Sequence, residues 1–272
     1  MNQKLISQCE MGFGTYKNHD NGTAFLKNLE IVCGLKQYQF IDTARLYKNE
    51  KAIGYALSKI PPIKKENILI QSKVWTNQFH QVKKELIKSL TDLRLLKLDS
   101  YLLHRPHWDM KVNIKAWQDL IKCQQQGLVT EIGVSNFDYE MIMILYNKTG
   151  VMPAINQIEL SVSNMRWDRI FNNKKLKIVT QSWRPLTNDF KSISKNPLIV
   201  QLSKKYKVAE ALILVAFLKN LKLCPIVKSQ NQERIIENAK AFEIKLSEKE
   251  IAQLQKLNIY ISASSSTYSK LK

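Results

Sequence analysis

A repeating unit, a short apolar segment followed by an amphipathic stretch, constrains the fold of this chain most strongly. The apolar side chains at 82, 86, 90 and 93 recur at the spacing of a helix, as do those within 53–60 and 235–242. Eight units predict an α/β fold, a closed (β/α)8 TIM barrel. An open doubly wound sheet competes, but no G-x-G-x-x-G follows an early strand. We expect strands within 11–16 and at 39–41, 68–70, 101–103, 132–134, 154–155, 178–179 and 225–227.

The chain shows no low-complexity linker and no Pro/Gly-rich boundary along its 272 residues. Barrels of this kind commonly reach this length as one domain. We therefore expect residues 1–272 to form a single barrel domain, with 259–272 a loose C-terminal tail.

Apolar runs and cysteines exclude several classes of protein. The longest apolar run, at 211–218, is far short of the roughly 20 residues that a membrane span needs. The first residues contain no apolar segment of signal-peptide length, so we expect a cytoplasmic protein that does not bind membranes. The four cysteines form no C-x-x-C pair and do not cluster with histidine, so we expect neither a metal site nor a disulfide framework.

The formal net charge of +19 is the one unusual global property. Strongly basic chains can bind nucleic acids, anionic membranes or small anions. Here the lysines are scattered, and no block of five like charges occurs. We interpret the charge as a solvated basic surface and expect no specific nucleic-acid binding.

Polar residues follow nearly every apolar segment. Ile41 leads into Asp42, and Leu103 leads into His104. The same pattern places polar side chains after the segments at 68–70, 132–134, 154–155 and 225–227. Because the C-terminal ends of all strands of a barrel meet at one rim, these distant residues are expected to be neighbours there.

Four of these residues suit the reduction of a carbonyl group, which needs a hydride donor, a proton donor and a group that polarises the carbonyl oxygen. Tyr47 can donate the proton, and the Lys73 ammonium is expected to lower its pKa from the ordinary value of about 10. Asp42 can hold Lys73 in place, and His104 can orient the substrate oxygen. Each residue alone also has a structural interpretation: Asp42 as a helix cap, Lys73 as a solvated lysine and His104 as a structural histidine.

Here the chain resembles a known family. Residues 42–50, DTARLYKNE, are similar to the D-T-A-x-x-Y-x-N-E signature of the aldo-keto reductases. Lys73 in IQSKVW and His104 in DSYLLHRP resemble that family's catalytic lysine and histidine, and the similarity covers nearly the whole chain. The resemblance implies that Tyr47 is the general acid, that Lys73 and Asp42 tune it, and that His104 orients the carbonyl.

The resemblance also implies a site for the nicotinamide. Residues 133–137, GVSNF, match the family's G-x-S-N-F, and Ser135 and Asn136 would bind the carboxamide together with Gln157. These side chains suit a group with two donors and one acceptor, although Ser135 and Asn136 could also merely cap the helix expected after them. Trp183 corresponds to the ring that stacks on the nicotinamide, and Arg184 follows it.

Residues 227–238 resemble the family's P-K-S-x-x-x-x-R-I-x-E-N motif. The resemblance implies that Lys228, Ser229 and Arg234 hold the 2′-phosphate of NADPH, with Glu237 and Asn238 near the adenine. Two cations and a hydroxyl around one dianion favour NADPH/NADP+ over NADH.

The chain departs from the family near the site. Arg105 replaces a common tryptophan, Arg184 replaces a small residue, Val227 replaces proline, and 159–162 lack the E-x-H-P motif. We hypothesise that Arg105 or Arg184 favours a substrate with a carboxylate or phosphate. The alternative is that Arg105 points outward and Arg184 touches the cofactor pyrophosphate. Tyr16 and Trp75 match positions that line the substrate pocket, although either could belong to the core.

The sequence therefore predicts an NADPH-dependent oxidoreductase that reduces aldehydes or ketones to alcohols. We expect a monomer that acts on a small-molecule carbonyl substrate. Two alternatives remain: an NADPH-binding barrel that serves as a sensor or regulatory subunit, and a basic nucleic-acid-binding protein on a barrel scaffold.

Overall fold

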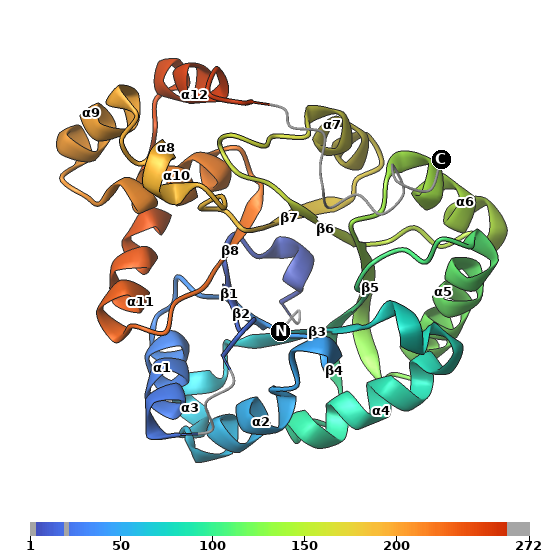
Figure 1. The fold of residues 1–272 in the computed structure, drawn as a ribbon. Coiled ribbons are helices and arrows are strands. Elements are labelled where there is room, and N and C mark those ends of the chain that lie inside the picture. The colour runs from blue at the N-terminus through green and yellow to red at the C-terminus, as the bar shows by residue number, and fades with distance from the viewer. Residues whose placement is uncertain (1–3, 19–21, 260–272) are drawn as a thin grey trace.

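The structure, a computed structural model, describes residues 4–18 and 22–259 and contains a closed barrel of parallel strands (Figure 1). Each strand pairs with the next one along the chain, and the last strand pairs with the first through Gly12 and Ile226. The predicted (β/α)8 barrel is confirmed. Its strands are β1 (Gly12–Gly14), β2 (Phe40–Asp42), β3 (Leu69–Val74), β4 (Leu98–Leu103), β5 (Val129–Ser135), β6 (Ile155–Glu159), β7 (Val179–Trp183) and β8 (Cys224–Val227).

Helices surround the barrel as an outer ring (Figure 1). The helix expected at 82–93 from its spacing is present with those bounds. The ring contains α1 (Thr23–Gly34), α2 (Glu50–Lys59), α4 (Val82–Leu93), α5 (Met110–Gln125), α6 (Tyr139–Thr149), α7 (Trp167–Lys175), α10 (Glu210–Asn220) and α11 (Gln232–Ala239). Shorter or additional elements are α3 (Pro62–Lys65), α8 (Phe190–Ile193), α9 (Pro197–Tyr206), α12 (Glu248–Gln255) and the 3-10 turns η1 (Ile6–Gln8), η2 (Arg45–Tyr47), η3 (Thr76–Gln81) and η4 (Lys240–Phe242).

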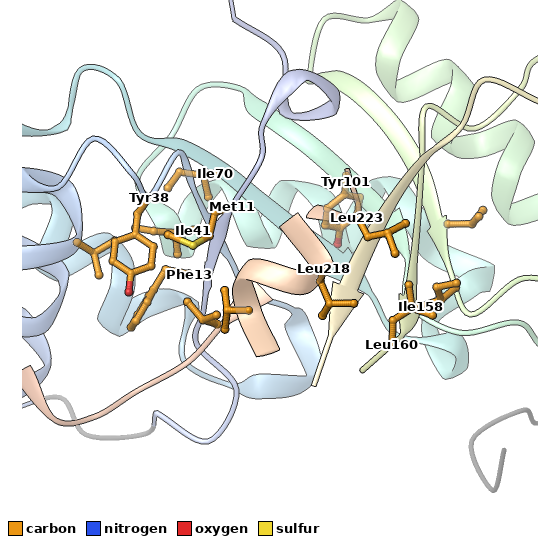
Figure 2. Packing of buried hydrophobic residues seen from close by; sticks show 14 of the residues in the cluster. Met11, Phe13, Tyr38, Ile41, Ile70, Tyr101, Ile158, Leu160, Leu218 and Leu223 are labelled. Atoms are coloured by element: carbon orange, nitrogen blue, oxygen red, sulfur yellow. The ribbon is translucent and has the colours of Figure 1, made fainter. Parts of the chain in front are cut away.

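The main core lies between the barrel wall and the ring of helices. Alternate strand residues such as Ile41, Ile70 and Tyr101 point outward into it (Figure 2). Phe13 of β1 meets Tyr38 edge to face, with the ring centroids 5.6 Å apart. Each fully buried side chain of this size contributes roughly 1.5–3 kcal/mol through the hydrophobic effect, so this layer holds the helices on the barrel.

The barrel interior near the N-terminal ends of the strands contains a second, smaller apolar cluster. Phe40, Leu102 and Ile226 meet there, contributed by three different strands, and Ile6 of η1 packs beneath them. Gly12 makes room for this layer, because a Cβ at that position would lie 2.4 Å from the Phe40 ring. The next layer toward the C-terminal rim is polar and belongs to the site.

Several sequence expectations concern features outside the barrel itself. In the described part of the chain, no helix is both long and apolar enough to cross a membrane. Over the same residues, His, Cys, Asp and Glu side chains form no group of three that could hold a metal ion, and the four cysteines are free thiols. Apart from Ile259, the tail expected at 259–272 lies outside the described residues, and the single domain stays a prediction.

Candidate active site

A buried ion pair forms the centre of the C-terminal rim. Lys73 near the end of β3 donates hydrogen bonds to both carboxylate oxygens of Asp42 on β2, at 2.7 and 2.6 Å, and to the Thr43 carbonyl at 3.0 Å. Lys73 is 0% and Asp42 4% exposed. Asp42 therefore does not cap a helix and Lys73 is not solvated, which excludes the structural interpretations considered for both residues.

Tyr47 and His104 lie next to this pair. The Lys73 Nζ lies 5.2 Å from the centroid of the Tyr47 ring. Tyr47 in turn meets His104, which follows β4, edge to face at 5.6 Å. The barrel thus brings together all four residues of the predicted quartet.

The turn η2, which carries Tyr47, is fixed by Arg45. The Arg45 guanidinium pairs with Glu50 of α2 at 2.5 Å and with Asp92 and Glu85 of α4 at 2.7 and 3.3 Å. One cation thus holds three carboxylates from two helices and attaches the turn to both of them. Tyr47 therefore stands on a short turn whose position depends on the helix ring.

The protonation of Tyr47, beside the Lys73–Asp42 pair, differs from the sequence expectation. Burial raises the pKa of Tyr47 well above its ordinary value, and the Asp42 charge raises it further. The expected lowering of the Tyr47 pKa by Lys73 is wrong for this structure, because burial dominates and the Asp42 charge acts in the same direction. Burial lowers the pKa of Lys73, and the Asp42 carboxylate opposes that effect.

His104 is neutral in this environment. Burial, followed by the charges of Lys73 and Arg105, lowers its pKa well below the ordinary value of 6.5. Its Nδ1 is buried without a hydrogen-bond partner. An unpaired buried N–H costs about 1–3 kcal/mol, so the ring proton is more stable on Nε2. The resulting tautomer can donate one hydrogen bond, from Nε2.

A cavity of about 580 Å³ opens above the quartet. Tyr47 and His104 form part of its lining together with the predicted pocket residues Tyr16, Trp75 and Arg105. Tyr16 meets Tyr47 at 5.0 Å and Trp75 meets His104 at 5.1 Å between ring centroids. Tyr16 and Trp75 therefore lie at the site and not in the core.

The residues expected around the nicotinamide line the same cavity. Ser135, Asn136, Gln157 and Trp183 are all among its walls. Asn136 donates to Ser135 Oγ at 3.0 Å, and its Oδ1 accepts a hydrogen bond from Trp183 Nε1 at 3.1 Å. The helix cap considered for Ser135 and Asn136 is made instead by Asp138, whose side chain accepts from the Met141 N–H at 2.9 Å.

The residues expected around the 2′-phosphate and adenine lie at and beyond the end of β8. Lys228 lines the cavity, and its pKa is lowered by burial and by the like charge of Lys17. Ser229 accepts a hydrogen bond from the Asn231 N–H at 3.1 Å, just before α11. Arg234 and Glu237 belong to α11, where Arg234 is exposed, and Asn238 of the same helix is 8% exposed.

The two unusual arginines have different surroundings. Arg184 pairs with Glu159 at 3.3 Å and its guanidinium lies 5.0 Å from the centroid of Trp183. Arg105 is partly buried, lines the cavity and lowers the pKa of His104. These observations favour the hypothesis that Arg105 acts at the site over the alternative in which it points outward.

Gln71 and Gln181 were not assigned a role from the sequence. Gln71 pairs in register with Asp42, and Gln181 with Gln157, so all four side chains share the polar layer inside the barrel. Gln71 donates to Asp42 Oδ1 at 2.8 Å. The sequence did contain a sign of this. Alternate residues of a strand face the same side, and Gln71 and Gln181 occupy strand positions that face the barrel interior, as Asp42 and Gln157 do.

Known proteins provide an independent comparison. The model of the Aldo/keto reductase family matches residues 10–259. The methylglyoxal reductase DkgA of Escherichia coli (strain K12) is 34% identical over 254 residues, which cover 93% of this chain and 90% of that protein.

Solved structures agree with this result. The aldo-keto reductase MGS-M4 from a Medee basin deep-sea metagenome library superposes with a TM-score of 0.85 at 25% identity, covering 96% of this chain and 94% of that one. The aldo-keto reductase AKR2E4 of Bombyx mori, solved in complex with NADP, gives 0.79 at 26% identity and covers 91% and 88%. With the family model spanning nearly the whole barrel, this chain belongs to the aldo/keto reductase family of oxidoreductases.

Proposed function

We propose that this protein reduces small aldehydes and ketones to alcohols with NADPH, and that Tyr47 is the general acid. The observation that carries the proposal is the buried Lys73–Asp42 pair beside the Tyr47 ring, with His104 on the wall of the same cavity. This use of a fully buried lysine on the rim explains why a phenol and a neutral imidazole converge there.

The protonation states suit this reaction. A phenol with a raised pKa stays protonated at neutral pH, so Tyr47 holds a proton ready for transfer. It can still donate that proton, because the alkoxide that forms during reduction is a stronger base than a phenolate. Neutral His104 can donate from Nε2 to the carbonyl oxygen and thereby orient and polarise it. NADPH supplies the hydride when it is bound.

The residues around the cavity fit this cofactor. Lys228 and Ser229 lie between β8 and α11, and Arg234 lies in the first turn of α11. Cationic and hydroxyl groups together with a helix N-terminus favour a phosphate. Burial and, after it, the like charge of Lys17 lower the pKa of Lys228, and a bound phosphate would oppose both effects. We assign Glu237 and Asn238 to the adenine end, and Trp183 with Ser135 and Asn136 to the nicotinamide end.

The walls of the pocket suggest small substrates with an apolar part. Tyr16, Trp75 and Leu46 offer aromatic and aliphatic contact next to the quartet. Methylglyoxal, the compound named for the Escherichia coli relative, is a suitable first substrate. The preference for anionic substrates stays a hypothesis, which we now assign to Arg105, because Arg105 lines the cavity and its charge acts on the pKa of His104.

The test is NADPH oxidation across aldehydes, ketones and keto-acids, with Tyr47→Phe as the control. We expect steady turnover by the wild type and a loss of at least about 100-fold in the variant, the lower end of a general acid's contribution. Retention of full activity by Tyr47→Phe would refute the assigned mechanism. Tight NADPH binding without turnover of any carbonyl would favour the sensor alternative.

Arg105→Trp tests the substrate preference. We expect the variant to lose catalytic efficiency on anionic aldehydes while it keeps its efficiency on neutral ones. An equal effect on both classes would exclude the role of Arg105 in substrate choice.

A further inference from the structure

We propose that Gln71 and Gln181 are positioning residues that hold the Gln157 amide with its oxygen toward the cavity. The inference rests on the proposed function, since it concerns how the site recognises the nicotinamide carboxamide. The three glutamines and Asp42 form one hydrogen-bonded layer across the barrel interior, contributed by β2, β3, β6 and β7. All four side chains are at most 4% exposed.

Asp42 determines the orientation of two of the amides. Its Oδ1 accepts from Gln71 Nε2 at 2.8 Å and from Gln157 Nε2 at 2.9 Å. An ionised carboxylate can only accept hydrogen bonds, so an amide oxygen in either place would face a negative charge. The nitrogen of Gln157 therefore points toward Asp42.

Gln181 is the second acceptor for the Nε2 groups of Gln71 and Gln157. Its Oε1 accepts from Gln71 Nε2 at 2.7 Å and from Gln157 Nε2 at 3.0 Å. Its own Nε2 donates to Gln71 Oε1 at 3.2 Å. Both amide protons of Gln157 are thus engaged, one by Asp42 and one by Gln181, and rotation of the amide would break two hydrogen bonds.

The consequence is a fixed acceptor at the cavity. Gln157 lines the cavity, and the polar atom left for a ligand is its Oε1. An oxygen in that place can accept from the NH2 group of a carboxamide and cannot donate to the carboxamide oxygen. The layer therefore specifies which end of the carboxamide group Gln157 recognises.

A purely structural layer would not need this chemistry. The layer directly below it is apolar, with Phe40, Leu102 and Ile226 filling the barrel. Burying polar amides costs free energy that only their mutual hydrogen bonds recover, so apolar side chains of similar size would stabilise the barrel at least as well. The amides are explained by the orientation that they impose on Gln157.

The experiment compares two ligands that differ only at the group in question: NADP+ and its 3-acetylpyridine analogue, in which a methyl group replaces the NH2. Dissociation constants are measured by quenching of protein tryptophan fluorescence. The wild type is expected to bind NADP+ about 3- to 10-fold more tightly than the analogue, the range for one neutral hydrogen bond.

Three variants separate positioning from general damage to the barrel. In Gln181→Met and Gln71→Met the ratio of the two dissociation constants is expected to approach 1. In Gln181→Glu, which keeps an acceptor for both Nε2 groups, the ratio is expected to stay near the wild-type value. The matched control is Asn156→Leu, a fully buried amide on β6 whose side chain bonds Phe137 and Asn173 away from the cavity. Asn156→Leu should lower stability and leave the ratio unchanged.

Two results would overturn the inference while the proposed function stands. One is a wild-type ratio of 1 in an enzyme that oxidises NADPH, and the other is a wild-type ratio preserved in both methionine variants. A variant that fails to fold leaves the other to decide, because each removes a bond of the same layer. Absence of NADP+ binding by the wild type would instead refute the proposed function itself.

Discussion

Removing either partner of the Lys73–Asp42 pair should destabilise the protein, but only the loss of Asp42 should give a deficit that depends on pH between 7 and 9. Breaking a buried ion pair typically costs about 3–5 kcal/mol, because the remaining charge has no counter-ion. In Lys73→Met, Asp42 keeps the amide donors Gln71 and Gln157 at 2.8 and 2.9 Å. We therefore expect this variant to lose about 3 kcal/mol, at the lower end of that range.

Asp42→Asn leaves a different problem, because no other carboxylate of residues 4–18 and 22–259 lies within hydrogen-bond distance of Lys73. Burial already lowers its pKa from 10.5, and the Asp42 charge that opposes this effect is removed. Lys73 should then be neutral in the folded protein and protonated in the unfolded chain. Each pH unit below 10.5 costs about 1.4 kcal/mol, so the penalty reaches at most about 5 kcal/mol at pH 7 and about 2 kcal/mol at pH 9.

The sign of this pH dependence follows from proton binding. Between the folded-state pKa of Lys73 and 10.5 the unfolded chain binds the extra proton, so raising the pH favours the folded state. The measurement is urea unfolding followed by far-UV circular dichroism at pH 7 and 9, with each variant compared to the wild type at the same pH. The deficit of Asp42→Asn should shrink by about 1.5–2.5 kcal/mol, whereas that of Lys73→Met should change by less than about 0.5 kcal/mol.

Equal deficits of Asp42→Asn at the two pH values would refute this explanation, since the cost would then not arise from the Lys73 charge. The double variant gives a second check. Because neither charge remains, its loss should be at least about 2 kcal/mol smaller than the combined losses of the two single variants.

Three further predictions follow from the altered protonation of other groups. Because the pKa of His104 lies well below 6.5, the rate of NADPH oxidation should be flat between pH 6 and 8, and an inflection near 6.5 would contradict neutral His104. Hydrogen bonds from Lys205 and Ser247 lower the pKa of Glu250 from 4.5 to about 2 against the effect of burial, so its stabilisation is present above pH 4.5 and is lost as the pH falls toward 2. Urea unfolding at pH 6 and 3 should therefore show the deficit of Glu250→Gln, at most about 3 kcal/mol, shrinking at the lower pH. Burial raises the pKa of Cys9 and Cys33 to about 12, so both thiols should react very slowly with DTNB at pH 8 until urea unfolds the chain.

The sequence predicted the barrel well because its signals are local. Each strand–helix unit has its own periodicity, and the helix expected at 82–93 has those bounds in α4. Strand ends were less accurate, since β5 begins at Val129 where the apolar segment was placed at 132–134. Pairing with neighbouring strands extends a strand beyond its apolar residues, and a single segment carries no record of that pairing.

The site could be predicted only as far as residue identity allows. The strand-end pattern located the quartet, but it could not give the direction of the Tyr47 pKa, which depends on burial and on the Asp42 charge. The surroundings of Arg184 were also inaccessible, because its partner Glu159 lies on another strand. Charge compensation is a property of three-dimensional distances, and the spacing along the chain does not contain them.

The glutamine layer shows a further reason why sequence reasoning stopped short. Gln71 and Gln181 are 110 positions apart, and each alone looks like an ordinary polar residue on a strand. Their importance comes from the strand register and from the alternation of side chains along each strand, which together place them inside the barrel at the level of Asp42. The barrel interior is apolar at the level of Phe40 and polar at the level of Gln71, one layer further along the strands. The apolar layer fills the barrel, whereas the polar layer orients the side chains of the site. In such a barrel, the transition between these two layers separates the residues that stabilise the fold from those that orient the ligand-binding side chains.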